Sequence, residues 1–112
     1  MSDIQTLTDE LVKFRDEREW AQFHDSKNLA IAISIEAAEL NELFLWKNGA
    51  EAEAIDKERL KEELADIFSF CLLLADKHKL DVKEIVLNKL CLSGKKYPVE
   101  KSRGTAKKYD EL

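Results

Sequence analysis

Four carboxylate residues recur at one spacing in two apolar stretches of the chain. Glu36 and Glu39 lie three positions apart in AIAISIEAAEL, and Glu63 and Asp66 repeat that spacing in EELADIF. Residues i and i+3 share one face of a helix, and a carboxylate buried among apolar side chains is costly unless its charge is compensated. If two such helices pack antiparallel, the four carboxylates converge and repel one another. A divalent cation removes that repulsion, and oxygen-only ligands favour Mg²⁺, with Mn²⁺ as a possible substitute.

Two other interpretations of these carboxylates have to be weighed. Glutamates at this spacing are common on exposed helices, where water solvates them, and Glu53, Glu58 and Glu62 fit that description. A di-iron carboxylate bundle would need Glu-x-x-His pairs. Neither His24 nor His78 follows a glutamate by three residues, which disfavours the di-iron interpretation. A hard-metal site and a solvated acidic face both remain open.

Four helices are expected to position these residues. Periodic apolar residues predict helices over 3–17, 27–48, 57–78 and 82–93. Asp25 or Ser26 is placed to cap the second helix, and Asp81 to cap the fourth. Gly49 and Gly94 are expected to end the second and fourth helices. No strand-like alternation is present, so the fold class is predicted to be all-α.

The two middle helices carry more apolar surface than one small subunit can cover. Over 29–45 and 67–74, leucine, isoleucine and phenylalanine face nearly every side of the helix axis. A helix that is apolar all round is buried on all sides. We therefore expect an antiparallel four-helix bundle-like subunit, one domain over 1–112, that assembles into a homo-oligomer.

The composition excludes several other classes of protein. No apolar run approaches the ~18 residues of a membrane span, and no signal-peptide pattern opens the chain. The net charge is −5, with +3 on residues 95–112 and hence −8 on the remainder, which does not suit binding to a nucleic acid polymer. The basic C-terminal segment is either a solvated tail or a clamp that reaches phosphate. Cys71 and Cys91 lie in apolar surroundings and are expected to be buried, reduced thiols in a cytoplasmic protein.

Beyond the carboxylates, several segments resemble the MazG-like, all-α nucleoside triphosphate pyrophosphohydrolases. EAAEL and EELADIF are similar to the family's E-x-x-E and E-x-x-D motifs. REWAQFH, LFLWK, KKYP and RGTAKKYDEL resemble the dCTP pyrophosphatase branch in particular, and together they span most of the chain. The resemblance implies Mg²⁺-dependent hydrolysis of a (deoxy)nucleoside triphosphate to the monophosphate and pyrophosphate. The substrate would be dCTP or a related or modified dNTP, in nucleotide-pool house-cleaning, and the assembly a tetramer.

The resemblance also implies roles for individual residues. The residues that would hold Mg²⁺ are Glu36, Glu39, Glu63 and Asp66. Glu39 is the favoured general base for the attacking water. The candidates for the substrate pocket are Trp20, Gln22, Phe23, His24, Trp46 and Phe70. An aromatic face that stacks on a nucleobase contributes ~1–3 kcal/mol, although tryptophans at these positions could instead pack in the core.

The sequence departs from the family pattern at three positions. Phe70 stands where relatives carry tyrosine, so one polar contact to the sugar or base is lost and a strict preference for dCTP is in doubt. Cys91 and Ser93 stand where relatives carry aspartate and asparagine. The basic residues that keep positive charge for the phosphates are Lys89, Lys95 and Lys96.

Two further functions compete with nucleotide hydrolysis. The apolar surface of the middle helices would also suit a non-catalytic oligomerisation or nucleotide-sensing module. A hydrolase for a different phosphorylated metabolite would use the same carboxylates and turn over nucleoside triphosphates poorly.

Overall fold

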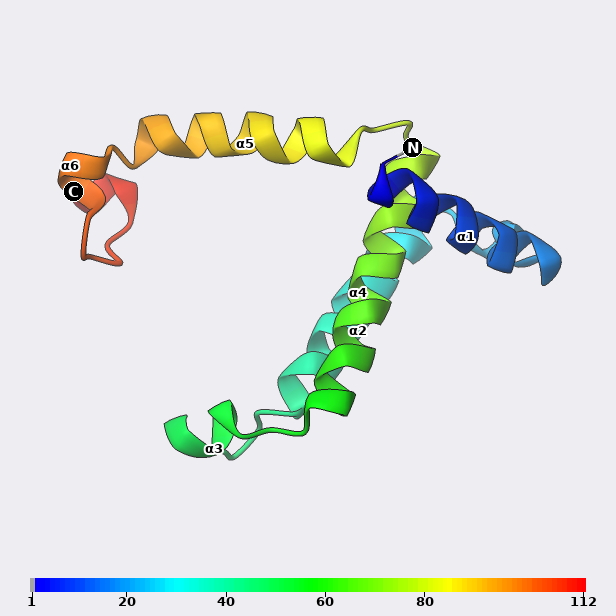
Figure 1. Ribbon diagram of the computed structural model, residues 1–112, viewed down its shortest axis with the longest axis horizontal. Coiled ribbons are helices and arrows are strands. Elements are labelled where there is room, and N and C mark those ends of the chain that lie inside the picture. The colour runs from blue at the N-terminus through cyan, green and yellow to red at the C-terminus, as the bar shows by residue number, and fades with distance from the viewer. Residues whose placement is uncertain (1) are drawn as a thin grey trace. The chain divides into compact units, whose positions relative to one another are not determined.

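The computed structural model describes residues 2–112, and the regular elements in that range are all helices, with no strand. The elements are α1 (Asp3–Glu17), η1 (Trp20–Phe23), α2 (Ser26–Glu42), α3 (Gly49–Glu53), α4 (Lys57–Lys77), α5 (Val82–Lys96), α6 (Val99–Ser102) and η2 (Tyr109–Glu111) (Figure 1). The predicted all-α class is confirmed. The helices fall into two compact units, one extending to Leu80 and the other from Asp81 to Leu112.

The five longest helices each begin at a residue whose side chain accepts a hydrogen bond from the first helical turn. These N-caps are Ser2, Asp25, Asn48, Asp56 and Asp81. Each such cap stabilises its helix by ~1 kcal/mol. Asp25, rather than Ser26, caps α2, with 2.7 Å between its Oδ1 and the Asn28 nitrogen. The Ser26 hydroxyl instead lies 2.8 Å from His78 Nε2 and joins the start of α2 to the end of α4.

Helix α2 is shorter than the sequence predicts. It ends at Glu42 rather than Asn48, and turns follow it. Trp46 then adopts a left-handed backbone with φ of 64°, which a bulky side chain adopts only at an energetic cost. Gly49 does not stop a helix, as we expected, but opens α3 behind its cap Asn48. The prediction missed α3 because a five-residue helix is too short to show apolar periodicity.

The second unit corrects the predicted end of the fourth helix. Gly94 lies inside α5, which continues to Lys96. Pro98 follows two residues later as the N-cap of α6. A glycine costs ~1 kcal/mol in a helix interior but does not by itself end it. The Tyr97 and Tyr109 rings meet edge to face with centroids 6.0 Å apart, which packs the end of α5 against η2.

The core of the first unit lies where α2 and α4 run side by side in opposite directions, with α1 against α4 (Figure 1). The residues buried there are Leu29, Leu43, Leu73, Ala75 and Thr8. Leu29 is the most buried, at 2% exposure. Three of the four expected helices thus belong to this unit. Because α5 belongs to the second unit, the four-helix arrangement stays a prediction.

Two further expectations concern the surface. Cys71 and Cys91 are free but exposed, so the prediction that they are buried is wrong for the single chain. Among the residues described, we find no helix with both the length and the apolar character needed to cross a membrane.

Candidate metal and nucleotide site

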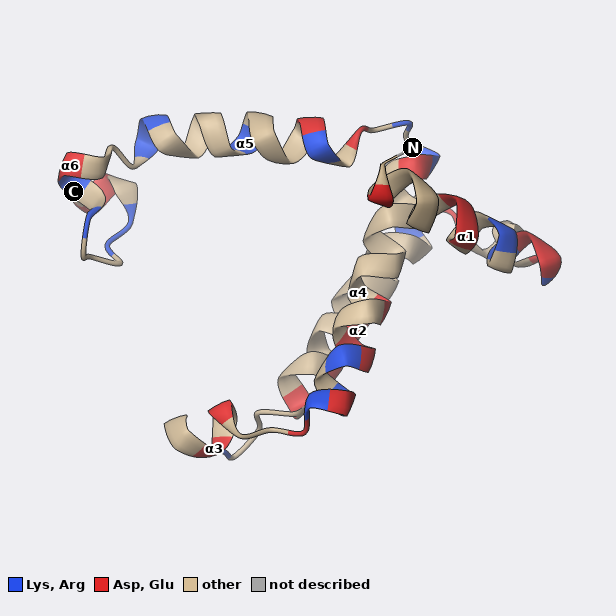
Figure 2. Ribbon diagram, in the orientation of Figure 1, with Lys and Arg blue, Asp and Glu red and all other residues tan. Residues whose placement is uncertain are grey.

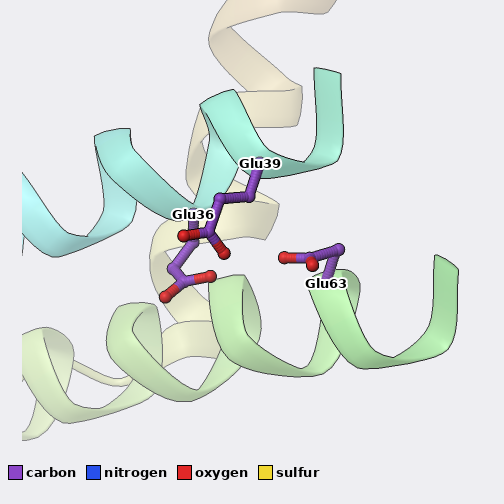
Figure 3. A group of neighbouring side chains, drawn as sticks. All are labelled: Glu36, Glu39 and Glu63. Atoms are coloured by element: carbon purple, nitrogen blue, oxygen red, sulfur yellow. The ribbon is translucent and has the colours of Figure 1, made fainter. Parts of the chain in front are cut away.

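Three of the four predicted carboxylates meet between α2 and α4. Glu36 and Glu39 extend from α2 and Glu63 from α4, and one oxygen of each lies within 4.8 Å of the others (Figure 3). The i, i+3 spacing puts the first two on one face of α2, and the antiparallel partner helix presents the third. We refer to Glu36, Glu39 and Glu63 as the carboxylate cluster.

Asp66 lies beside the cluster but outside it. Its carboxylate is exposed and is not among the groups that share the 4.8 Å separation. Its negative charge nevertheless contributes to raising the pKa of both Glu36 and Glu63. Asp66 is therefore near enough to act on the cluster electrostatically, and its part in metal binding stays a prediction.

The cluster is electrostatically unfavourable without a counter-charge. Burial raises the pKa of Glu36 to about 7, with further contributions from a hydrogen bond to Glu39 and from the neighbouring negative charges. Burial also raises the pKa of Glu63, followed by the charge of Glu39, whereas the positive charge of Arg59 opposes the rise. Both shifts have the sign expected of carboxylates crowded together in a partly buried place.

The donor set of the cluster fits a hard divalent cation. Glu36 Oε2 and Glu63 Oε2 are buried and lack a hydrogen-bond partner within residues 2–112. Buried polar atoms are ordinarily paired, so two unpaired oxygens in one cluster need a ligand. A cation with oxygen ligands would pair both oxygens and offset the repulsion that raises the two pKa values.

His24 and Phe70 form an aromatic pair close to the cluster. Their ring centroids are 6.3 Å apart in an edge-to-face arrangement, and Phe70 follows Asp66 by one turn of α4. Burial, with a smaller effect from Arg15, lowers the pKa of His24, so its imidazole is neutral at pH 7. Its Nδ1 is buried and makes no hydrogen bond to the described chain, which leaves it free for a ligand.

The other four candidates for the substrate pocket lie outside this aromatic pair. Trp20 packs edge to face on Phe14, with centroids 5.8 Å apart, and Gln22 donates a hydrogen bond to the Glu19 carbonyl. Phe23 is 60% exposed and Trp46 is 92% exposed. Neither Trp20 nor Trp46 is buried in the core of the single chain. The alternative that these tryptophans serve as core packing is therefore not supported within one chain.

The predicted phosphate-binding lysines lie in the second unit. Lys89, Lys95 and Lys96 are all on α5, and Lys96 Nζ lies 4.8 Å from the centroid of the Tyr109 ring. Their contact with phosphate stays a prediction.

The structure also shows two basic residues that the sequence analysis missed. Lys47 and Arg59 line a cavity of about 220 Å³ in the first unit. Arg59 precedes Glu63 by four residues, a spacing that puts both on one face of α4. That spacing could have drawn attention to Arg59 in the sequence, whereas nothing in the sequence places Lys47 beside it.

The chain is similar to known proteins in sequence and in fold. The model of the MazG-like family matches residues 31–112. The chain is 38% identical to dCTP pyrophosphatase 1 of Rattus norvegicus over 117 aligned positions, covering all of this chain and 67% of the rat protein. The identity to dCTP pyrophosphatase 1 of Homo sapiens is 35% with the same coverage. The crystal structure of a pyrophosphatase from Archaeoglobus fulgidus DSM 4304 is similar with a TM-score of 0.83 and 37% identity, over 88% of this chain and 94% of that one.

Proposed function

The chain belongs to the MazG-like family and is a nucleoside triphosphate pyrophosphohydrolase, and we propose that it converts dCTP or a related or modified dNTP to the monophosphate and pyrophosphate with Mg²⁺. The observation that carries the proposal is the carboxylate cluster. Its two buried, unpaired oxygens supply ligands of the kind that Mg²⁺ takes, and the pyrophosphatase from Archaeoglobus fulgidus has a similar fold. The biological role would be the removal of unwanted dNTPs from the nucleotide pool.

The carboxylates of the cluster would have two roles, ion binding and proton transfer. Glu36 and Glu63 would hold Mg²⁺ through their buried oxygens, with Glu39 and Asp66 as further ligands. When bound to these residues, Mg²⁺ would neutralise triphosphate charge and lower the pKa of the water that attacks the α-phosphorus. Glu39 lies between the other two carboxylates in their influence, since it contributes to the raised pKa of both Glu36 and Glu63, and it is the favoured general base, which would accept the proton of that water.

The nucleobase would lie against the aromatic residues of the first unit. A neutral His24 can donate or accept one hydrogen bond through its free Nδ1. Within one chain Trp46 adjoins Lys47, on the side of the cluster away from His24, so its exposed ring would stack on a base held by another copy in the homo-oligomer. Its left-handed backbone is a strain of the kind that gathers at functional sites. Trp20, Gln22 and Phe23 would extend this surface. Phe70 has no hydroxyl, so it would contribute contact area without a polar contact to the base.

The exposed surface supports assembly into a homo-oligomer, as in the tetramer that the family resemblance implies. Large apolar side chains are exposed in both units, namely Ile35 at 53% and Phe68 at 63% in the first and Leu90 at 62% in the second. Covering these side chains with further copies of the chain would remove them from water.

A substrate panel tests the proposed reaction directly. Purified protein is incubated with each dNTP and with base-modified dNTPs in Mg²⁺, and pyrophosphate and monophosphate are both measured. The variants Glu36→Gln and Asp66→Asn should lose activity while circular dichroism shows unchanged helix content. Glu62→Gln is the matched control, because Glu62 neighbours Glu63 in sequence but is exposed and outside the cluster.

The outcome separates the proposal from its competitors. Full turnover in Glu36→Gln would contradict the metal assignment. Nucleotide binding without any hydrolysis would favour the sensing module, and poor turnover of every nucleoside triphosphate would favour a different phosphorylated substrate.

A further inference from the structure

A cavity lies beyond the carboxylate cluster, where the chain leaves α2 and enters α4. Leu43, 5% exposed, lies on one of its walls and follows Glu39 by four residues, one turn along the chain. Arg59 lies on another wall and precedes Glu63 by four residues on α4. Since the two helices are antiparallel, both steps lead away from the cluster in the same direction, opposite to Phe70. The cavity and the His24–Phe70 pair therefore flank the cluster on opposite sides.

Two cations in this cavity lack a partner. Within residues 2–112, neither Lys47 nor Arg59 forms an ion pair, since the pairs found there join Arg15 to Asp16 and Lys61 to Glu58. Both side chains can therefore donate hydrogen bonds to an anion, and Arg59 also acts on Glu63 through its charge.

The acidic groups of the cavity do not neutralise these cations. Asp56 is engaged as the cap of α4, where its Oδ1 accepts a hydrogen bond from the Glu58 nitrogen at 3.0 Å. Glu51 also lines the cavity, but it is exposed and pairs with neither cation. Charged residues gather in the half of α4 that faces α3, whereas the other half is almost free of them (Figure 2). The N-terminus of the 21-residue helix α4 adds positive potential at this end.

The size of the cavity and its two cations suit a polyanion. Its volume of about 220 Å³ is several times the ~30 Å³ that one water occupies in the liquid. The Arg59 guanidinium is a planar fork that can bind two phosphate oxygens at once, and the Lys47 ammonium is an adaptable point charge. Together they offer donors to the two phosphate groups of a pyrophosphate unit.

We propose that Lys47 and Arg59 form the subsite for the β- and γ-phosphates, which leave as pyrophosphate. This inference rests on the proposed function, because it assigns the end of the substrate that the cluster does not hold. In the reaction, the water oxygen bonds to the α-phosphorus and gives up its proton to Glu39. The bond from that phosphorus to the α,β-bridging oxygen breaks, and its electron pair leaves with pyrophosphate. The two cations stabilise the charge that develops on this leaving group.

The test measures the binding of two product probes to the full-length chain in Mg²⁺ by isothermal titration calorimetry. One probe is inorganic pyrophosphate and the other is dCMP, which lacks the β- and γ-phosphates. The variants are Lys47→Gln, Arg59→Gln and the double variant, with Lys57→Gln as a matched control, since Lys57 is an exposed cation of α4 that does not line the cavity. We expect pyrophosphate to bind about tenfold more weakly in each single variant, and dCMP to bind unchanged. Arg59→Lys should recover part of the loss.

Two results would overturn the inference. One is pyrophosphate affinity within twofold of wild type in the double variant, and the other is an equal loss of affinity for both probes. These results are distinct from failure of the proposed function. A wild-type protein that hydrolyses no dNTP, yet loses pyrophosphate affinity selectively in the variants, refutes the function and leaves an anion site. Active variants with normal pyrophosphate binding refute the subsite and leave the function intact.

Discussion

Glu36→Gln should stabilise the metal-free protein at neutral and alkaline pH. The Glu36 carboxyl has a pKa of about 7 in the folded chain, against 4.5 as its ordinary value. The folded state therefore binds the proton more tightly than the unfolded state. Between these two values, stability falls as the pH rises, and above pH 7 the whole penalty of ionisation is present. Glutamine keeps the shape of the side chain and removes that penalty.

The magnitude follows from the shift, at 1.36 kcal/mol per pKa unit. A rise from 4.5 to about 7 corresponds to roughly 3 kcal/mol. The site is open to solvent on one side, and screening reduces the effect to about 1–2 kcal/mol. For a chain of this length, that is a rise of roughly 4–8 °C in Tm at pH 8. At pH 4.5 the carboxyl is protonated in the folded state, so the variant should gain little.

The assay is thermal and urea unfolding in EDTA from pH 4.5 to 8, at one fixed protein concentration because assembly would also shift the midpoint. Wild type should lose stability across this range, and Glu36→Gln should lose less. Added Mg²⁺ should stabilise wild type at pH 8 and the variant far less. Glu62→Gln, which lies outside the cluster, should follow wild type. A Glu36→Gln protein that is less stable than wild type at pH 8 would refute the electrostatic reasoning.

The remaining predictions concern the aromatic surface, a helix cap and the core. Trp46→Ala should weaken binding of the nucleotide product about 5- to 100-fold in titration calorimetry, because a stacking platform is lost. Its Tm should stay within about 2 °C of wild type, since the ring is 92% exposed. Asp25→Ala removes the cap that accepts the Asn28 N–H at 2.7 Å, and urea unfolding should show a loss of about 1 kcal/mol. Leu29→Ala opens a cavity at the most buried side chain and should cost about 2–5 kcal/mol in the same assay.

Local chemistry made much of the fold predictable. Asp25, Asp56 and Asp81 each precede an apolar-periodic run, and each caps a helix where the sequence placed its start. The predicted end of α2 was wrong. The chain leaves the helix after Glu42 through turns that lead to Trp46, whose backbone is left-handed. Apolar periodicity continues through that segment, so the pattern alone could not show where the helix stops.

The sequence also predicted part of the candidate site. The i, i+3 spacing indicated which carboxylates share a helix face, and the structure adds how the two faces meet. Asp66 satisfies the spacing but is not among the groups within 4.8 Å of one another, because helix position alone does not fix where a side-chain oxygen lies. Lys47 could not be assigned at all, since its place beside Arg59 depends on the turn that follows α2.

The register of α2 on α4 gives the site a linear order. Four residues separate Glu39 from Leu43 on one helix and Arg59 from Glu63 on the other, a step of roughly 6 Å along each axis. The His24–Phe70 pair, the carboxylate cluster and the cavity of Lys47 and Arg59 therefore follow one another in this order along the two helices. A nucleoside triphosphate has the same order, from base to α-phosphate to the terminal phosphates. Slipping one helix by a single residue would rotate its carboxylates away from the cluster, so packing of the small Leu29 core must fix the register on which the chemistry depends.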